Sequence, residues 1–555
     1  IPPTMNRTLK RSLSVGPFPR FFGISRLTNP LGVLFISLVS VVFVSDTHAA
    51  PPVGFVNEEV LSSLEQPIGM RFLPDGRMLL LLKKGEVKIV DPTSLPADSA
   101  TYMDLNNAPN GLNSTQERGV LDIALDPDFS AVEPYVYVLY TPLSGSQKLR
   151  VSRFTHQEVF GGMTSRGDPL SEVVLWEDTE GYDSCCHFGG GLDFGPEGYL
   201  WITTGDHFQG SYAESLTSAG GGVHRIAKDG SIPAGNPYAD GPGGNVDSLV
   251  AYGLRNPFRA RWDLTSGRYF IGEVGGNTQS IAWEDVHVIN YDPVFGLQDS
   301  DGGAYDGINF GWPTVEGLPP YDDFTAVNID AAGEPLFAYP HDGQTSAITG
   351  GVVYRGNTFP SQFEGAYFYA DSTRDFVRYL RFNPDGSIIP NPSPDPISAD
   401  SPELTSYSFD LDPVGRVVSF EVGPDGALYY VSFTDAGGAF GNSNPGTPGS
   451  VHRYVYDGGN PRPQIVEFSN VPTTALSLTV DFTIRALEVD SEPMTYILNF
   501  GDGSSTGPTA LPQDAPIVVS HTYPTDGVFQ ASLEVSDGNL ASVSNDSVAV
   551  GVPPS

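Results

Sequence analysis

The chain has 555 residues, with 29 lysines and arginines against 66 aspartates and glutamates, which is a formal net charge of −37. This surplus of negative charge repels phosphate backbones and anionic lipid headgroups, so it disfavours nucleic acid and membrane-surface partners. Only two cysteines are present, which excludes a disulfide scaffold and a cysteine-rich metal site, and 63 glycines with 48 prolines favour many short strands joined by turns.

The first 50 residues have the three parts of a secretory signal. Five basic residues between positions 7 and 26 precede an uncharged apolar run at 31–44, and small residues stand before Pro51. The apolar run is too short to cross a bilayer comfortably. We therefore expect residues 1–50 to be a signal peptide with the residues upstream of it. The mature protein would then be periplasmic or secreted and have no membrane span, and an uncleaved anchor is the alternative.

One pattern recurs between about residues 60 and 457: an apolar run, a turn with an acidic residue and a glycine, and a second apolar run. Clear copies begin at Met70, Leu192 and Phe420, and weaker ones at Asp122, Ala260 and Gly351. Such a turn between β-rich runs predicts a hairpin. Six hairpins over about 400 residues predict an all-β fold in which residues 51–457 form a six-bladed β-propeller, because radial stacking buries both faces of every sheet. Two β-sandwiches are the alternative.

The residue composition and the pattern of predicted strands change near Gly458. The stretch DGGNPRPQ is a polar linker rich in glycine and proline, and short alternating strands follow from Leu476, Met494, Ala515, Gly527 and Ser542. Evenly spaced short strands are typical of an immunoglobulin-like sandwich. We expect residues 458–555 to be this linker and a second, β-sandwich domain.

The densest group of unusual residues is CCHFGGGL, residues 185–192. His187 on a glycine-flanked loop can act as a general base near neutral pH, although a loop histidine that caps backbone groups is the plainer interpretation. Cys185 and Cys186 are adjacent, and adjacent α-carbons lie closer together than those of an ordinary disulfide. A strained eight-membered disulfide ring and two packed thiols both stay open.

Two further loops carry candidate ligands. Arg255 and Asn256 stand between a glycine and a proline and offer fixed donors to an anionic or carbonyl-rich ligand. The stretch DSDGGAYDG places Asp299, Asp301 and Asp306 as in part of a calcium loop, but it lacks the full spacing and the distal glutamate, so a solvated acidic turn is the alternative.

Several nucleotide and nucleophile signatures are missing or misplaced. No strand leads into a GxGxxG helix start, and no Walker loop occurs. The GxSxG match at residues 503–507 falls in a loop of the predicted sandwich, where a nucleophile elbow is not expected.

A set of motifs resembles a known family. In chain order these are ERGVLDIALDPDF from Glu117, CHFGGGLDFGPEGYLWITTGD from Cys186, GGGVHRIAKDGSIPAGNPY from Gly220, AYGLRNPF from Ala251, GEVGGNTQSIAWEDVHVI from Gly272, NFGWP from Asn309 and ITGGVVYRGNTFP from Ile348. They resemble the glucose/sorbosone dehydrogenase family, which contains soluble pyrroloquinoline-quinone-dependent aldose sugar dehydrogenases and hedgehog-interacting-protein-like relatives. Residues 460–552 resemble a polycystic kidney disease (PKD) domain.

The resemblance implies a role for individual residues. It places His187 as the general base, Glu117 at the cofactor edge, and Arg255 and Asn256 on the quinone. It also implies cofactor contacts from Trp312, in an aromatic motif near the substrate cleft, and from Arg374. The backbone of Gly275 and Gly276 would bind calcium.

The implied activity is that of an exported quinoprotein dehydrogenase that oxidises an aldose or related sugar with pyrroloquinoline quinone and calcium. His187 would remove the hydroxyl proton while hydride passes to the quinone, calcium would polarise the quinone carbonyl, and Arg255 would stabilise the developing charge. Because the chain has no CxxCH haem-attachment motif, the electrons would leave to a separate acceptor.

Differences from the family pattern leave a second, competing function open. No lysine lies in YPHDGQTSAITGG, residues 339–351, where the family's glucose dehydrogenases place one against the quinone. The rival is a non-catalytic propeller that binds glycans or proteins, helped by the PKD domain. A calcium-dependent propeller hydrolase would need a central carboxylate cluster, which the spacing of the residues does not reveal.

Overall fold

The computed structural model describes residues 51–551 apart from 53, 131, 145–147, 159–162, 181–183, 299–304, 318–332, 393–404, 412, 434–447, 457–462, 474–476, 488–492 and 539–540. The predicted signal, most of the predicted linker, and Asp299 and Asp301 therefore lie outside the described residues. Within them, no helix is long and apolar enough to cross a membrane.

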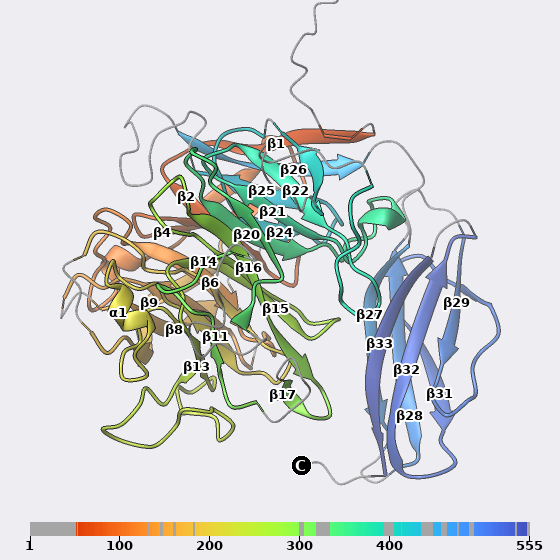
Figure 1. Cartoon of the computed structure of the whole chain (residues 1–555). Coiled ribbons are helices and arrows are strands. Elements are labelled where there is room, and N and C mark those ends of the chain that lie inside the picture. Colours follow the sequence, from red (N-terminus) through yellow and green to blue (C-terminus); the bar gives the residue numbers. More distant parts are fainter. Residues whose placement is uncertain are drawn as a thin grey trace, which may run out of the picture. The chain divides into compact units, whose positions relative to one another are not determined.

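The described part of residues 55–456 contains six sheets (Figure 1). Four of them follow the chain strand by strand. The first two are β2 Pro67–Phe72, β3 Met78–Leu82, β4 Glu86–Asp91 and β5 Asp98–Asp104, and then β6 Val120–Leu125, β7 Tyr135–Tyr140, β8 Arg150–Gln157 and β9 Arg166–Glu177. The third is β14 Pro257–Asp263, β15 Arg268–Glu273, β16 Trp283–Asp292 and β17 Gly296–Gln298, with β19 Phe337–Pro340 against β16. The fourth is β20 Ile348–Val353, β21 Tyr367–Asp371, β22 Phe376–Leu380 and β23 Tyr407–Asp410.

The other two sheets include strands from distant parts of the chain. One is β10 Leu192–Phe194, β11 Leu200–Thr203, β12 Gly222–Ile226 and β13 Leu249–Tyr252, to which β18 Ile308–Asn309 pairs in parallel. The other is β24 Val417–Val422, β25 Leu428–Ser432 and β26 Gly449–Tyr456, extended by β1 Phe55–Leu64. Short helical segments occur at α1 Gly210–Ala213 and in 3-10 turns at Leu105–Asn107 and Ser361–Phe363.

The first strands of the six sheets form a closed ring. In order, β2 contacts β6, β6 contacts β10, β10 contacts β14, β14 contacts β20, β20 contacts β24, and β24 contacts β2 again. Sheets that meet in a ring about one axis form a β-propeller, so the all-β propeller prediction is confirmed. Each predicted hairpin is the pair formed by the first two strands of one sheet, as in β2–β3 and β24–β25.

The two ends of the propeller sequence close the ring. Strand β1 pairs with β26 in antiparallel fashion, from Phe55 opposite Tyr456 to Leu64 opposite Gly449. The last sheet therefore takes its outer strand from the start of the chain. Inner and second strands are buried on both faces, as in β3, where all five residues of MLLLL are buried. This burial explains why these runs are continuously apolar rather than alternating.

Residues 464–550 form a two-sheet sandwich with its own core, which includes Val480, Leu498 and Leu533. One sheet is β27 Gln464–Pro472, β28 Thr479–Leu487 and β31 Ile517–Thr522, and the other is β30 Thr509–Leu511, β29 Met494–Asn499, β32 Gly527–Ser536 and β33 Ala541–Val550. Sequence reasoning missed β27 and β30. The sandwich prediction is confirmed, and the GxSxG match lies in the loop between β29 and β30.

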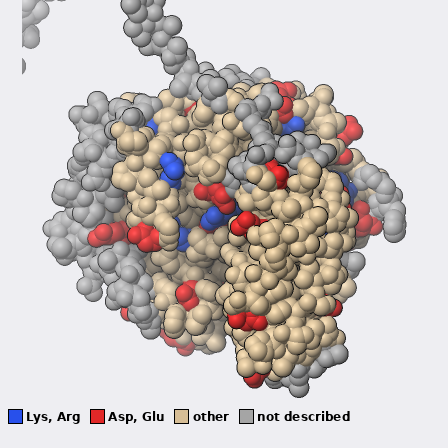
Figure 2. Space-filling view, turned by 90° about the vertical axis from the view of Figure 1, so that its right-hand side faces the viewer, with Lys and Arg blue, Asp and Glu red and all other residues tan. Residues whose placement is uncertain are grey.

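Charged side chains are spread over the surface. On the described part of the face in Figure 2, the basic side chains lie in small separate groups among acidic ones rather than in one continuous area. This distribution agrees with the net charge of −37.

Candidate active site

A cavity lies at one end of the ring, where the innermost strands begin. Its apolar wall comes from the first or second residue of four of these strands and from two neighbouring loops: Ile68, Leu121, Phe258, Ile348, Phe188 and Val274. Its polar groups include Lys83, Glu117, Asn256 and Ser372. The empty space inside the cavity and its open mouth together is about 640 Å³.

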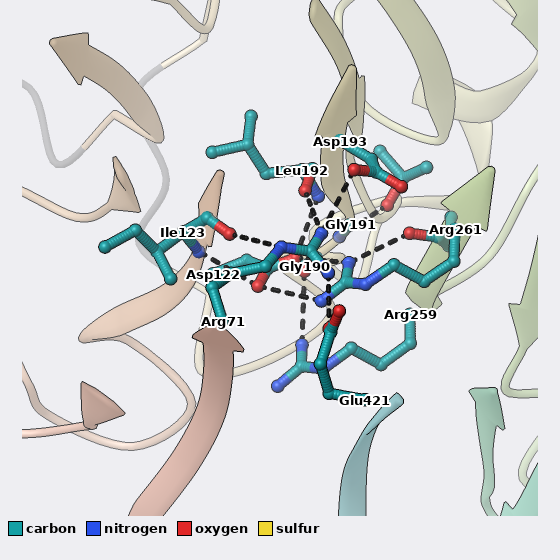
Figure 3. A network of polar contacts seen from close by, with 12 residues as sticks. Arg71, Asp122, Ile123, Gly190, Gly191, Leu192, Asp193, Arg259, Arg261 and Glu421 are labelled. Atoms are coloured by element: carbon teal, nitrogen blue, oxygen red, sulfur yellow. Dashed lines mark hydrogen bonds and ion pairs between the residues drawn. The ribbon is translucent and has the colours of Figure 1, made fainter. Parts of the chain in front are cut away.

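Buried ion pairs lie further along the same strands (Figure 3). Arg261 binds both carboxylate oxygens of Asp122, at 2.6 and 3.1 Å, and Arg71 contacts Asp193 at 3.2 Å and Glu421 at 2.6 Å. Removing one partner from such a buried pair costs about 3–5 kcal/mol, because it leaves a charge without compensation. The network thus joins the innermost strands β2, β6, β10, β14 and β24 across the ring.

Arg259 connects this network to the cavity wall. Its guanidinium donates to the carbonyl of Gly190 at 3.1 Å (Figure 3). It also donates to the carbonyl of Ile68 at 2.5 Å. Burial lowers the pKa of Arg259 to about 10, and the carboxylate of Asp122 opposes this effect. The segment after His187 is thereby tied to the start of β2.

His187 and Asp206 form a buried pair. Neither lines the cavity, but Phe188 and Gly189, which directly follow His187, do. The Nδ1 atom of His187 lies 2.6 Å from Oδ1 of Asp206, and the indole Nε1–H of Trp312 donates to Oδ2 of Asp206 at 2.9 Å. Burial acts to raise the pKa of Asp206, but the hydrogen bonds from His187 and Trp312 outweigh it and hold the pKa below its usual value. An ionised Asp206 accepts the proton on Nδ1, so Nε2 carries the lone pair of the neutral imidazole.

The backbone of His187 is held in an unusual conformation. Its φ is +63°, in the left-handed region, which costs a non-glycine residue on the order of 1 kcal/mol. The carboxylate of Glu117 accepts the N–H of His187 at 2.7 Å, and the N–H of His207 donates to its carbonyl at 3.1 Å. Both contacts stabilise this conformation, so Glu117 positions the loop that carries His187.

Cys185 and Cys186 form a disulfide directly before His187. The ring prediction is therefore confirmed, and the alternative of two free thiols is wrong. The carbonyl of Cys185 accepts the N–H of Glu117 at 3.3 Å, and Arg118 donates to the carbonyl of Ser184 at 2.5 Å. The disulfide loop is thus fixed on the Glu117–Arg118 segment.

The glycines after His187 allow the backbone to pass close to neighbouring strands, and Gly189 also lines the cavity. A Cβ on Gly189 would lie 2.5 Å from the carbonyl oxygen of Thr203, and one on Gly190 would lie 2.8 Å from that of Phe258. Only glycine allows this close passage between neighbouring sheets.

Asn256 and Arg255 occupy different places. Asn256 lines the cavity, and its Oδ1 accepts the N–H of Gly189 at 3.0 Å, which leaves the side-chain NH₂ as the donor for a ligand. The guanidinium of Arg255 donates to the carbonyl of Val274 at 3.1 Å and to Asn277 Oδ1 at 2.7 Å, and it lies over the ring of Trp312. Arg255 therefore supports the cavity wall and the Trp312 ring.

Arg374 does not join this group. Its guanidinium donates to the carbonyls of Pro340 and His341, at 3.0 and 2.6 Å, and it is not among the residues that line the cavity. Of the three aspartates in the predicted acidic calcium loop, the structure describes Asp306 alone, so that loop stays a prediction.

Gly275 and Gly276 lie in a group of buried carboxylates. The N–H of Gly275 donates to Glu284 at 3.3 Å, and that of Gly276 donates to Glu316. Burial raises the pKa of Glu273 to about 8 and that of Glu316 to about 7.

Asp285 belongs to the same carboxylate group. Its Oδ1 atom is buried and has no hydrogen-bond partner among the described residues, and Glu273, Asp285 and His287 each place a ligand atom within 4.8 Å of the others. Sequence reasoning did not find this group, whose members lie on β15 and β16. A hard cation suits so many oxygen donors at one place.

The structure adds two residues that sequence reasoning missed. Asp206 ends the motif CHFGGGLDFGPEGYLWITTGD, yet only the fold brings its carboxylate to His187. Lys83 reaches the cavity from the end of β3, far along the chain from the segment where a lysine was expected. A larger pocket of about 1420 Å³, near Tyr199 and Tyr291, contains none of the predicted site residues.

The comparisons with known families cover both parts of the chain. Residues 64–440 match the family model for glucose/sorbosone dehydrogenase, and residues 466–550 match that for the PKD domain. The chain is 25% identical to aldose sugar dehydrogenase YliI of Escherichia coli K12 over 411 residues, which cover 72% of this chain and 96% of that protein. It is 29% identical to human hedgehog-interacting protein over 229 residues, which cover 38% and 32%.

Solved structures resemble the propeller. A putative oxidoreductase (glucose dehydrogenase) from Thermus thermophilus is 25% identical with a TM-score of 0.52, covering 72% of this chain and all of that one. The PQQ-bound aldose sugar dehydrogenase of Streptomyces coelicolor is 20% identical with a TM-score of 0.50, covering 73% and 100%. At this identity the second likeness concerns the fold alone.

Proposed function

Because the chain belongs to the glucose/sorbosone dehydrogenase family, we propose that it is an exported dehydrogenase that oxidises an aldose or related sugar with pyrroloquinoline quinone and calcium. The observation that carries this proposal is the buried His187–Asp206 pair beside a cavity that also contains Lys83 and Asn256. A general base with a fixed tautomer next to a cavity with cationic and amide donors suits removal of a hydroxyl proton.

The cavity has the chemistry that a flat anionic quinone needs. Apolar side chains such as Phe188, Phe258 and Ile348 offer faces for a planar ring system, and Lys83 and the amide of Asn256 offer donors to its oxygens. Glu117 and Asn256, both expected at the cofactor, lie in this cavity. Arg255 and Trp312 would support the ligand from behind. Arg374 does not line this cavity, so its cofactor role rests on the resemblance alone.

His187 would take the proton from the sugar hydroxyl on Nε2. Asp206 holds Nδ1 in the protonated form and stabilises the positive charge that the imidazole gains when it accepts that proton. When bound, the quinone would supply the acceptor for the hydrogen on the adjacent carbon. The disulfide loop and Glu117 keep the imidazole in place during this transfer.

Calcium would be held near Gly275 and Gly276. Backbone carbonyls of these glycines and the carboxylates of Glu273 and Asp285 are the oxygen donors that calcium prefers, and the unpartnered Oδ1 of Asp285 supports a cation there. The cation would compensate the buried negative charge and polarise a bound carbonyl.

The rival is a binding propeller without cofactor chemistry. The likeness to hedgehog-interacting protein and the absence of lysine from residues 339–351 favour it. The His187–Asp206 pair favours the enzyme, because a binding surface has no need for a buried histidine with a fixed tautomer. The PKD domain would contact a glycan or a protein in either case, and a separate acceptor would take the electrons from the enzyme.

Reconstitution tests the proposal. The purified chain, loaded with calcium and pyrroloquinoline quinone, should reduce a dye in the presence of at least one aldose from a panel of sugars. Substitution His187→Ala should lower turnover by roughly two to four orders of magnitude while quinone binding, followed by absorbance, stays intact. A native protein that binds no quinone would support the binding-module rival, and unchanged turnover in the variant would remove His187 from the mechanism.

A further inference from the structure

Lys83 is a buried cation in the wall of the cavity. It follows β3 directly, and only 4% of its surface is exposed. Among the described residues its ammonium donates one hydrogen bond, to the carbonyl of Ser114 at 2.8 Å. An ammonium has three donors, so two remain for other partners at a place where the cavity holds Glu117 and apolar walls.

The backbone around Lys83 is built to hold it there. Its N–H donates to the carbonyl of Gln66 at 2.9 Å, and its carbonyl accepts the N–H of Val120 at 3.0 Å, so it is fixed between the starts of β2 and β6. Gly119 has φ +143°, and a Cβ at this position would lie 2.3 Å from the carbonyl oxygen of Lys83 and 2.8 Å from its Cγ. Only a glycine leaves room for the backbone and the side-chain stem of Lys83 at this place.

The charges around Lys83 leave it poorly compensated. Burial lowers the pKa of its ammonium to about 8, Glu117 opposes this, and the neighbouring Lys84 adds to it. Burial in turn raises the pKa of Glu117, whose carboxylate also accepts the N–H of His187. A buried cation with two unused donors is costly in an empty cavity and favourable beside an anion.

We propose that Lys83 supplies the cationic contact for the carboxylate-bearing quinone in this cavity, in place of the lysine that is absent from residues 339–351. This inference rests on the proposed function. Lys83 would then determine the affinity for the cofactor. Glu117 would have a second role, because its carboxylate acts on the charge of Lys83 and also accepts the N–H of His187.

Lys84 provides the matched control. It is the same residue type at the next position, but its side chain is half exposed and pairs with Glu65 on the surface. Substituting either lysine with methionine changes the net charge by the same amount. A general electrostatic effect would therefore appear in both variants, and a contact in the cavity would appear only in the Lys83 variant.

The experiment titrates quinone into the calcium-loaded full chain and its Lys83→Met, Lys83→Arg and Lys84→Met variants, with binding followed by absorbance. The thermal midpoint of each quinone-free variant is measured in parallel, so that a folding defect is separated from a binding defect. We expect Lys83→Met to weaken binding at least about tenfold, as loss of one charge-assisted contact does. Lys83→Arg should restore part of the affinity, and Lys84→Met should leave it unchanged.

The pH dependence gives a second readout. The wild-type chain should lose affinity as the pH rises above about 8, because Lys83 then loses its proton, and Lys83→Arg should keep its affinity over that range. Equal affinities of Lys83→Met and the wild type would overturn the Lys83 proposal while the proposed function stands. A wild-type chain that binds no quinone would overturn both.

Discussion

Asp206 connects two residues that are far apart in the sequence. Its Oδ1 atom lies 2.6 Å from Nδ1 of His187, and its Oδ2 atom accepts the indole N–H of Trp312 at 2.9 Å. Because all three groups are joined through one carboxylate, the orientation of the base and that of the aromatic ring depend on each other.

Substitution Asp206→Asn should lower turnover by roughly two orders of magnitude or more, because an amide no longer holds Nδ1 as the donor. Quinone affinity should change little, since Asp206 is not in the cavity wall. Trp312→Phe, which removes one hydrogen bond to Asp206 and keeps an aromatic ring, should have a smaller effect. Steady-state rates and absorbance titrations of both variants check this, and equal losses in the two would contradict the assigned role.

The same pair should contribute to stability in a definite pH range. The pKa of Asp206 is lower in the folded chain than its ordinary value near 4, so its stabilisation is complete above that value and is lost as the pH falls through the folded-state pKa. In Asp206→Asn the thermal midpoint should be lower than in the wild type at pH 6, and the difference should shrink toward pH 3.

Chelation should lower the activity of the quinone-loaded protein at least about tenfold, because a metal ion that polarises a carbonyl contributes several kcal/mol to catalysis. Returned calcium should restore it. Asp285→Asn should weaken calcium binding, measured by calorimetry, since this carboxylate has an oxygen without a partner among the described residues. Full turnover in exhaustively metal-free protein would show that the cation has no catalytic role.

The Cys185–Cys186 disulfide should respond to mild reductant. Native protein should gain no alkyl group without prior reduction and two after it, as measured by intact mass. Reduction should lower turnover without unfolding the propeller, because the loop that the disulfide stiffens also contacts Glu117. A Cys185→Ser/Cys186→Ser double variant serves as the control and should be insensitive to reductant. Two alkyl additions to unreduced protein would exclude the disulfide.

A chain that ends at Tyr456 should keep its specific activity. Strand β26 ends there, and it pairs with β1, so the ring closes without residues from the sandwich. The sandwich has a hydrophobic core of its own, from Val480 to Val550. Specific activity and thermal unfolding of the shortened chain check this. If the shortened chain fails to fold, the two domains share a core.

Much of the fold could be predicted from local sequence. A turn such as Asp75–Gly76 needs a positive φ, which Gly76 has at +90°, and the apolar runs on either side form β2 and β3. All six predicted hairpins are present. The turns of the three clear copies contain such a glycine, at Gly76, Gly198 and Gly426, whereas residues 126–134 between β6 and β7 contain none. Strand β27 was missed because it follows directly on the Gly/Pro-rich linker, whose composition hides the alternation of residues 464–472.

The candidate site also contains residues that could be predicted from the sequence and residues that only the structure reveals. The sequence by itself determined His187 and Asn256 as candidates, because each stands in a short motif whose residues are neighbours in the chain, and the family resemblance added Glu117. Only the tertiary structure brought Lys83 and Asp206 to them and left Arg374 apart. The physical reason is that closure of the ring decides which strand ends meet. Lys83, Glu117 and Asn256 line one cavity although they are 34 to 173 positions apart, and such long separations leave no periodic signal in the sequence.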